Sequence, residues 1–487
     1  MTANAQRPKR QLPLAVLVGL AAVPAVLIGG AWQFAEANVP PPTSTTTTTV
    51  APPPAAALVT GLLSFRRHPT PLADEAAIAE ADAIWEASVA RLTTVIGTGS
   101  CLRVATADKI LLDIGDAPVI PASNQKLFVA ATALEVLGPD YRFTTELQSV
   151  APALGVISGD IYLIGGGDPV LRTSDVPDPQ QYPTINATAL EALADQLVVL
   201  GVTTIDGNVV GDGSRYDDER RVPSWPDDIT SAEAGPYDAL LVNDGLISNG
   251  NYGLDPNRSG AVKFLELLRA RGITVSGSAA NSARPADADF TTLALIRSLP
   301  LTDLLAEMLQ TSDDNTAEMM LKEIGFVATG QGTRQAGLDT IRATLERWGV
   351  PTDGLLMSDG SGLSRENRTT CKTLSALVDA TPVAGQLVAL LPVAGRSGTL
   401  VGQFLGTPAE ATLAAKTGTL TGVKALTGLQ PAGDGEPITF SLVLNGVLNG
   451  ANVNEESIYQ PIWNQLVKLV DQYPIVVVPQ QDGFAPP

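Results

Sequence analysis

One serine and one lysine in this chain have the types and the spacing that nucleophilic catalysis requires. Ser123 stands where an apolar, helix-favouring run begins, and Lys126 follows three residues later in the only Ser-x-x-Lys of the chain. Residues at i and i+3 share a helix face, so the hydroxyl and the amine can meet without any other element. A serine needs an adjacent base, and a lysine that is desolvated on an apolar helix can be that base. The helix N-terminus adds backbone N–H groups for a developing oxyanion.

Composition excludes several other kinds of site. The chain has 487 residues, of which only one is histidine and two are cysteine. The histidine, His68, lies among arginines and prolines in a loop-like stretch, which disfavours a Ser-His-Asp triad. Histidine- and thiolate-based metal sites lack ligands, so we expect no metal and no organic cofactor. The formal net charge of −20 argues against a nucleic-acid partner.

Two further groups that could complete the site lie far downstream. Ser312 stands in a polar loop between helices and could relay the proton to a leaving amine. Lys416 begins a Lys-Thr-Gly triplet ahead of strand-like runs. Lys416 would supply a positive charge for a substrate carboxylate and help to keep Lys126 neutral. Gly418 would leave room for a substrate backbone beside a strand edge.

This order of motifs resembles the serine D-Ala-D-Ala carboxypeptidases and endopeptidases among the low-molecular-mass, class C penicillin-binding proteins. The resemblance covers nearly everything from about residue 60 to residue 470, and it rests on the stretches 121–127, 165–169, 211–217, 359–364 and 416–419. It implies an α/β (α+β) fold of the β-lactamase/DD-transpeptidase type, with an antiparallel sheet flanked by helices and a large inserted domain. It also implies an oxyanion hole from the N–H groups of Ser123 and Thr419, and carboxylate binding by the hydroxyls of Thr417 and Thr419.

The second motif departs from the family pattern of Ser-x-Asn. The stretch 312–318 reads SDDNTAE. If its final Ala-Glu marks the register, Asp314 occupies the asparagine position, and Asn315 caps the next helix in a capping box with Glu318. The opposite register, with Asn315 against the substrate, stays open. A carboxylate at Asp314 would hold a neighbouring lysine in its ammonium form, so acylation would need a higher pH.

The remaining segments must position these groups. Periodicity predicts strands at 101–105, 110–112, 160–164 and 438–444, and helices at 188–201, 260–272, 301–310, 316–325 and 335–348. Basic residues followed by a long uncharged apolar run favour a membrane anchor over a cleaved signal peptide at the N-terminus. The predicted parts are an anchor or signal peptide at 1–37, a Pro/Thr-rich linker at 38–59, a penicillin-binding domain at 60–146 plus 298–476, an inserted α/β domain at 147–297 and a loose tail at 477–487.

The sequence therefore predicts an extracytoplasmic serine DD-peptidase of the cell envelope. It would cleave D-Ala-D-Ala, or the D-Ala cross-link, of peptidoglycan stem peptides through an acyl-enzyme on Ser123, with β-lactams as covalent inhibitors. A β-lactamase or esterase of the same superfamily is one alternative, against which the large insertion argues. A catalytically silent cell-wall-binding protein is another. The balance of carboxypeptidase and endopeptidase action stays open.

We also expect Cys101 and Cys371 to form a disulfide bond. Both lie in the predicted penicillin-binding domain and outside the insertion. Export would take the chain to an oxidising compartment, where disulfides persist. The closed loop would be long, and the chain-entropy estimate of its stabilisation is roughly 4–5 kcal/mol as an upper figure.

Overall fold

The computed structural model describes residues 83–94, 96–97, 99–176, 186–229, 231–248, 251–433, 435–448 and 450–473. The predicted N-terminal anchor or signal peptide, the linker and the C-terminal tail lie outside these residues. In the part of the chain that is described, no helix combines the length and the apolar character needed to cross a membrane.

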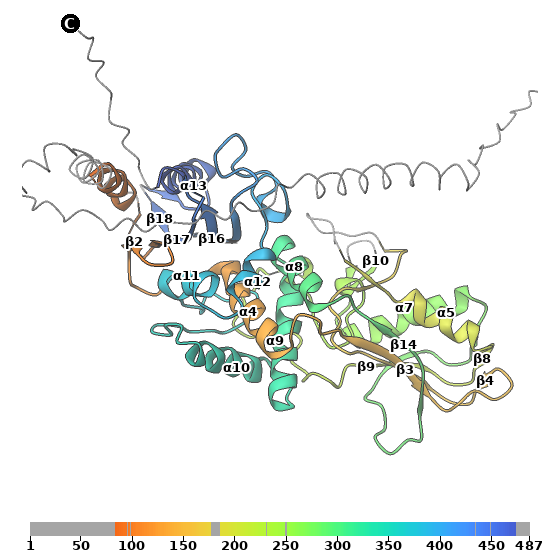
Figure 1. Ribbon diagram of the computed structural model, residues 1–487. Helices are drawn as coiled ribbons and strands as arrows, with labels where there is room; N and C mark the ends of the chain where they lie inside the picture. The colour runs from red at the N-terminus through yellow and green to blue at the C-terminus, as the bar shows by residue number, and fades with distance from the viewer. Residues whose placement is uncertain are drawn as a thin grey trace, which may run out of the picture. The chain divides into compact units, whose positions relative to one another are not determined.

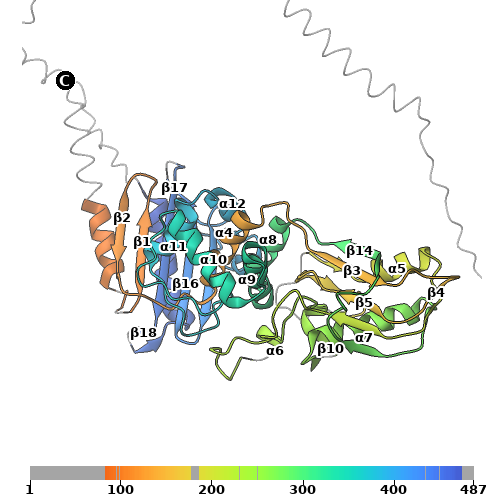
Figure 2. The same cartoon turned by 90° about the horizontal axis from the view of Figure 1, so that it is seen from below.

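A five-stranded antiparallel sheet joins strands from both ends of the described chain. Its order is β15-β16-β17-β1-β2, with antiparallel pairing throughout. Figure 2 shows β2, β1, β17 and β16 side by side, with β2 at the outer end. The bounds are β1 Cys101–Ala105, β2 Ile110–Ile114, β15 Ala414–Leu420, β16 Val423–Pro431 and β17 Pro437–Asn445.

Helices cover both faces of this sheet because its central strands are apolar on both faces. One core packs Ala425 and Val443 against the helices α4 and α8 to α12. The other packs Leu426 and Leu442 against α13 and a helical segment at 83–94. The bounds are α4 Lys126–Val136, α8 Leu301–Thr311, α9 Asp314–Thr329, α10 Arg334–Arg347, α11 Cys371–Asp379, α12 Ala384–Ala389 and α13 Glu456–Asp471.

The helix α4 lies at the centre of the first core. Its first nine residues, from Lys126 to Leu134, are all buried. A helix that is apolar on every side is stable only inside a protein. Accordingly, α8, α9, α10, α11 and α12 all pack against α4 (Figure 1). Any group on α4 is therefore held rigidly, including a lysine at its N-terminus.

Residues 144–297 build a second α/β unit, which begins three residues before the predicted insertion. Its main sheet has the order β13-β9-β5-β3-β14, and a small parallel sheet has the order β12-β8-β4. The helices α5 and α7 pack against the main sheet (Figure 1). The strands are β3 Thr144–Ser149, β4 Val156–Ile157, β5 Ile161–Ile164, β8 Thr204–Ile205, β9 Val209–Asp212, β12 Thr274–Val275, β13 Ala279–Asn281 and β14 Thr291–Arg297, and the helices are α5 Glu191–Val199 and α7 Pro256–Ala270.

Short elements complete the described chain. They are η1 Ala122–Gln125, β6 Leu171–Arg172, β7 Thr188–Ala189, α6 Ser231–Ala234, η2 Asn243–Gly245, β10 Leu246–Ser248, β11 Asn251–Tyr252, η3 Gly398–Leu400, β18 Val447–Leu448 and β19 Ala451–Asn452. The predicted α/β fold, an antiparallel sheet flanked by helices, is confirmed.

Some predicted element boundaries differ from those in the structure. The helix expected at 188–201 begins only at Glu191, because Thr188 pairs with Leu171 in a short strand. The helix expected at 260–272 begins earlier, where Asp255 accepts a hydrogen bond from the Arg258 N–H and Pro256 occupies the first turn. Side-chain caps and a proline at the first turn set such starts more strongly than apolar periodicity does.

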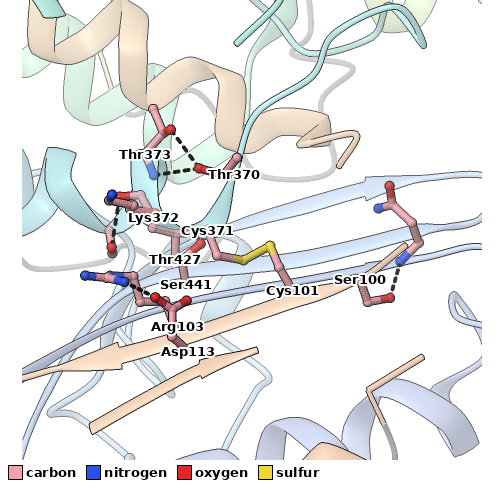
Figure 3. The surroundings of a disulfide bond; sticks show 12 residues. Ser100, Cys101, Arg103, Asp113, Thr370, Cys371, Lys372, Thr373, Thr427 and Ser441 are labelled. Atoms are coloured by element: carbon pink, nitrogen blue, oxygen red, sulfur yellow. Dashed lines mark hydrogen bonds and ion pairs between the residues drawn. A yellow bond between two sulfur atoms is a disulfide. The ribbon is translucent and has the colours of Figure 1, made fainter. Parts of the chain in front are cut away.

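The predicted disulfide bond is confirmed. The Cys101 and Cys371 sulfurs are 2.00 Å apart, and the bond joins β1 to the N-terminus of α11 (Figure 3). Both residues are buried. The bond closes a sequence separation of 270 residues that includes the whole second unit.

Candidate active site

Ser123 lies in η1, the tight turn that leads into α4. The preceding residue, Ala122, has φ 49°, a left-handed conformation that residues with a side chain rarely adopt. Glycines make this turn possible, because a β-carbon at Gly362 would lie 2.0 Å from the Ala122 oxygen. Asn124 anchors the turn to the sheet by donating its amide N–H to Thr427 Oγ1 at 2.8 Å. The serine is thus presented on a strained turn that its surroundings hold in place.

Lys126 lies next to this serine, as the i and i+3 spacing predicts. Its Nζ is 3.3 Å from Ser123 Oγ, and the side chain is fully buried. The same nitrogen donates to Asp314 Oδ1 and to the Ser361 carbonyl oxygen, both at 2.6 Å. The amine is therefore aimed at the candidate nucleophile and is also held by a carboxylate and a carbonyl.

Asp314 stands in the first turn of α9, with its side chain 16% exposed. Burial raises the pKa of this carboxyl to about 6, although the Lys126 charge acts in the opposite direction. The Asp314 carboxylate lies within ion-pair distance of Lys126. Of the two residues considered for the third position of the second motif, Asp314 is the one that contacts Lys126 in the structure.

The predicted helix cap at Asn315 is wrong. Asp313 caps α9, since its Oδ1 accepts from the Thr316 N–H at 2.6 Å. Asn315 lies within the helix, where it is buried and donates Nδ2 to Asp244 Oδ1 at 2.5 Å. It is not among the residues that line the groove described below. Aspartate and asparagine cap helices about equally well, so a local pattern could not choose between these neighbours.

Ser312 and Lys416 form a second hydroxyl–amine pair. Ser312 ends α8 in a left-handed conformation with φ 66°. Lys416 Nζ donates to Ser312 Oγ at 2.9 Å and to the Thr417 carbonyl at 3.0 Å. Burial, followed by the charge of Lys126, lowers the pKa of Lys416 well below its usual range. Burial therefore acts against the positive charge that was predicted for Lys416.

Two buried carboxylates beneath the site were not predicted to act in it. Glu318 Oε1 accepts from the N–H groups of Gly360 at 3.0 Å and Ser361 at 2.7 Å, rather than from the start of its own helix. Asp359 accepts from two later N–H groups of the same loop. Burial and the nearby Asp359 raise the pKa of Glu318 to about 8. Together these carboxylates orient the Ser361 carbonyl that contacts Lys126.

A groove of about 840 Å³ runs over these groups. Its volume is in the range of sites that bind small peptides and drug-sized ligands. Lys126 and Lys416 lie beneath its floor, fully buried. In the part of the chain that is described, no cluster of three or more histidine, cysteine, aspartate or glutamate side chains could hold a metal ion. The predicted residues that line the groove are Ser123, Ser312, Asp314, Thr417 and Thr419.

Strand β15 forms one wall of this groove and is the edge strand of the first sheet. Gly418 lies where β15 passes the Ser123 turn, since a β-carbon there would lie 2.9 Å from the Pro121 oxygen. Thr417 Oγ1 donates to Thr399 Oγ1 at 2.8 Å, so a third hydroxyl joins the two that were predicted. Asp228 and Ile229 of the second unit also line the groove.

Comparison with known proteins gives consistent matches. Residues 91–267 and 255–466 match the family model described as the D-Ala-D-Ala carboxypeptidase 3 (S13) family. The chain is 32% identical to a D-alanyl-D-alanine carboxypeptidase of Actinomadura sp. over 424 residues, which cover 70% of this chain and 76% of that protein. It is 30% identical to a carboxypeptidase of Mycobacterium tuberculosis over 389 residues, which cover 77% and 82%.

The fold also resembles solved structures. Penicillin binding protein 4 of Haemophilus influenzae superposes with a TM-score of 0.68 at 22% identity, over 79% of this chain and 99% of that one. A predatory endopeptidase of Bdellovibrio bacteriovorus superposes with a TM-score of 0.52 at 20% identity, over 77% and 94%. At these identities the likeness concerns the fold.

Proposed function

The chain belongs to the D-Ala-D-Ala carboxypeptidase 3 (S13) family, and from this premise we propose that its groove hydrolyses the D-Ala-D-Ala end, or the D-Ala cross-link, of peptidoglycan stem peptides. It is a serine-type DD-peptidase, and the resemblance to class C penicillin-binding proteins is confirmed. The contact that supports the residue assignment best is the 3.3 Å approach of Lys126 Nζ to Ser123 Oγ.

The reaction forms and breaks one acyl bond in each half. Ser123 Oγ attacks the carbonyl carbon before the scissile bond, and its proton passes to the neutral Lys126 amine. The bond from that carbon to the leaving nitrogen then breaks, and Ser312, bonded to Lys416, hands a proton to this nitrogen.

In the second half, water attacks the ester carbonyl and the bond from Ser123 Oγ to the acyl carbon breaks. The proton on Lys126 returns to Ser123 Oγ, and the proton that water loses replaces the one that Ser312 gave up. Asp314 favours the ammonium form of Lys126, so the reactive fraction increases with pH.

The edge position of β15 supports substrate binding by strand addition. A substrate backbone would extend the sheet along β15, while the absence of a side chain at Gly418 lets this strand approach the Ser123 turn. The N–H groups of Ser123 and Thr419 would bind the oxyanion, as in other acyl-transfer sites. The hydroxyls of Thr417 and Thr419 would hold the carboxylate of the residue that leaves.

The domain organisation and location belong to the same proposal. Residues 60–146 and 298–476 form the penicillin-binding domain, and 147–297 form the inserted domain. The order of the two main sheets along the chain supports this division. The buried disulfide suits an oxidising compartment outside the cytoplasm. The apolar composition of residues 1–37 supports an anchor or a signal peptide there.

Labelling with a fluorescent penicillin tests this proposal, together with hydrolysis of a peptide that ends in D-Ala-D-Ala. The wild-type protein should be labelled covalently and should release D-Ala. The Ser123→Ala variant should lose both activities at an unchanged melting temperature. Ser282→Ala, which removes an exposed hydroxyl outside the groove, should keep both.

Each alternative has its own result in these assays. A wild-type protein without label would be a silent wall-binding protein. Rapid penicillin turnover without release of D-Ala would indicate a β-lactamase. Labelled Ser123→Ala protein would overturn the assignment of the nucleophile.

A further inference from the structure

Besides Lys126 and Lys416, a third lysine lies at the groove, on the strand next to the Lys-Thr-Gly strand. Lys424 is on β16, directly opposite Thr419 in the register of the sheet. Its Nζ donates to Thr419 Oγ1 at 3.0 Å and lies 4.2 Å from the ring centroid of Tyr459 and 5.6 Å from that of Trp463. Of the described residues that line the groove, Lys424 is the only lysine or arginine.

Among the described residues, Glu456 is the carboxylate whose charge acts on Lys424. Asp228, Glu233 and Asp314 line the same groove. Burial lowers the pKa of Lys424, and the aromatic rings contribute to its desolvation. A partly desolvated ammonium group without a counter-ion is costly. An anion bound in the groove would supply that counter-ion.

Lys416 is less suited to this task. It lies beneath the floor of the groove, and its Nζ is directed to Ser312 and the Thr417 carbonyl. Burial lowers the pKa of both lysines, so the position of Lys424 on the groove wall is what distinguishes it. The charge that faces the groove beside the candidate carboxylate-binding hydroxyls is therefore that of Lys424.

The hydrogen bond from Lys424 also orients the Thr419 hydroxyl. Because Thr419 Oγ1 accepts a proton from Lys424, its own O–H is free to donate into the groove. A hydroxyl donor backed by an ammonium group is a strong site for a carboxylate, since charge-assisted hydrogen bonds are about twice as strong as neutral ones.

We propose that Lys424 determines specificity for a free carboxylate on the residue that leaves, acting with Thr419 and in place of Lys416. The inference rests on the proposed function and names the residue that recognises the carboxylate directly after the scissile bond. Peptides with this carboxylate should be preferred over otherwise identical peptides in which that carboxylate is an amide.

The test compares two peptides that end in D-Ala-D-Ala, one with a free C-terminal carboxylate and one with a C-terminal amide. Lys424→Met should lower kcat/KM for the carboxylate peptide by about 10- to 100-fold, the usual effect of losing a hydrogen bond to a charged group. It should leave the amide peptide within about twofold. Lys424→Arg should keep most of the wild-type preference for the carboxylate peptide over the amide peptide. Lys372→Met, at an exposed lysine outside the groove, is the matched control.

Equal losses for both peptides at an unchanged melting temperature, or no loss for either, would overturn the inference and leave the proposed function intact. If Lys424→Met unfolds, Lys424→Gln retains a donor to Thr419 without the charge and should show the same selective loss. The amide peptide provides an assay that needs no carboxylate. A wild-type protein that hydrolyses neither peptide and takes no penicillin label would overturn the proposed function and this inference together.

Discussion

Asp314 stands where the Ser-x-Asn pattern of the family has asparagine, and it contacts the candidate base directly. The 2.6 Å ion pair to Lys126 stabilises the ammonium form, whereas the reaction requires the neutral amine. The aspartate therefore works against acylation at low pH. An asparagine at the same place could keep a hydrogen bond to Lys126 without the negative charge.

We expect Asp314→Asn to move the rising limb of the pH–rate profile to lower pH. The substitution removes the negative charge that stabilises a proton on the amine, and the reaction requires an amine that can accept a proton. The measurement is the second-order rate of acylation by a fluorescent penicillin as a function of pH. Asp313→Asn is the matched control, since asparagine keeps the helix cap one residue away. Superimposable profiles for the wild type and Asp314→Asn would contradict the expectation.

The helix α9 connects the groove to the rest of the molecule through one face. Asp314, Glu318 and Lys322 are spaced four residues apart and therefore lie on the same side. Asp314 contacts the base, and Glu318 holds the 359–364 loop. Lys322, which is fully buried, bonds to Asp217 of the second unit at 2.6 Å. The position of this helix thus sets both the catalytic contacts and the docking of the second unit.

Glu318 should make the stability of the protein fall as the pH rises. Burial raises its pKa from an ordinary value of 4.5 to about 8 in the folded protein, so the folded state binds the extra proton between these values. The free energy of unfolding then decreases with pH across that window. Glu318→Gln cannot titrate, and its amide oxygen can accept the same two backbone N–H groups.

The measurement is the difference in unfolding free energy between the wild type and Glu318→Gln from acid to mildly alkaline pH. This difference should decline as the pH rises through the window, by about 5 kcal/mol as an upper limit, since each pKa unit corresponds to about 1.4 kcal/mol. Glu346→Gln, on an exposed face of α10, is the control and should give a flat difference. A flat or rising difference for Glu318→Gln would show that Glu318 is not protonated in the folded state.

The disulfide bond joins two segments of the chain that lie on either side of the second unit in the sequence, and that pack around the five-stranded sheet. Cys101 belongs to β1 and Cys371 to α11, on opposite sides of the second unit in the chain. The Cys101→Ala/Cys371→Ala variant should have a free energy of unfolding lower by roughly 5 kcal/mol at most, because its unfolded chain has no cross-link and gains conformational entropy. Urea unfolding with and without reductant provides the measurement. The same free energy of unfolding for the wild-type protein with and without reductant would contradict the expectation.

Local sequence was sufficient for the parts of this site that neighbouring residues build. Ser123 and Lys126 meet because three residues along a helix return to the same face. The buried character of α4 follows from a run in which nearly all residues from Leu127 to Leu134 are apolar. The order of the motifs was sufficient to indicate the family, and the antiparallel sheet was implied by that resemblance.

Contacts between distant segments required the folded structure. Asp313 and Asn315 are equally good caps in isolation, and packing of α9 against Asp244 determines which of them is buried in the helix. Glu318 acts on backbone N–H groups more than forty residues away along the chain, so its own neighbourhood carries no signal of that role. Lys424 contacts Thr419 because the two residues face each other across the strands β15 and β16. Its contacts with the Tyr459 and Trp463 rings depend on the packing of α13 against the sheet. Charge, burial and partner are properties of the assembled site, because the dielectric surroundings of a side chain are created by segments that the local sequence does not contain.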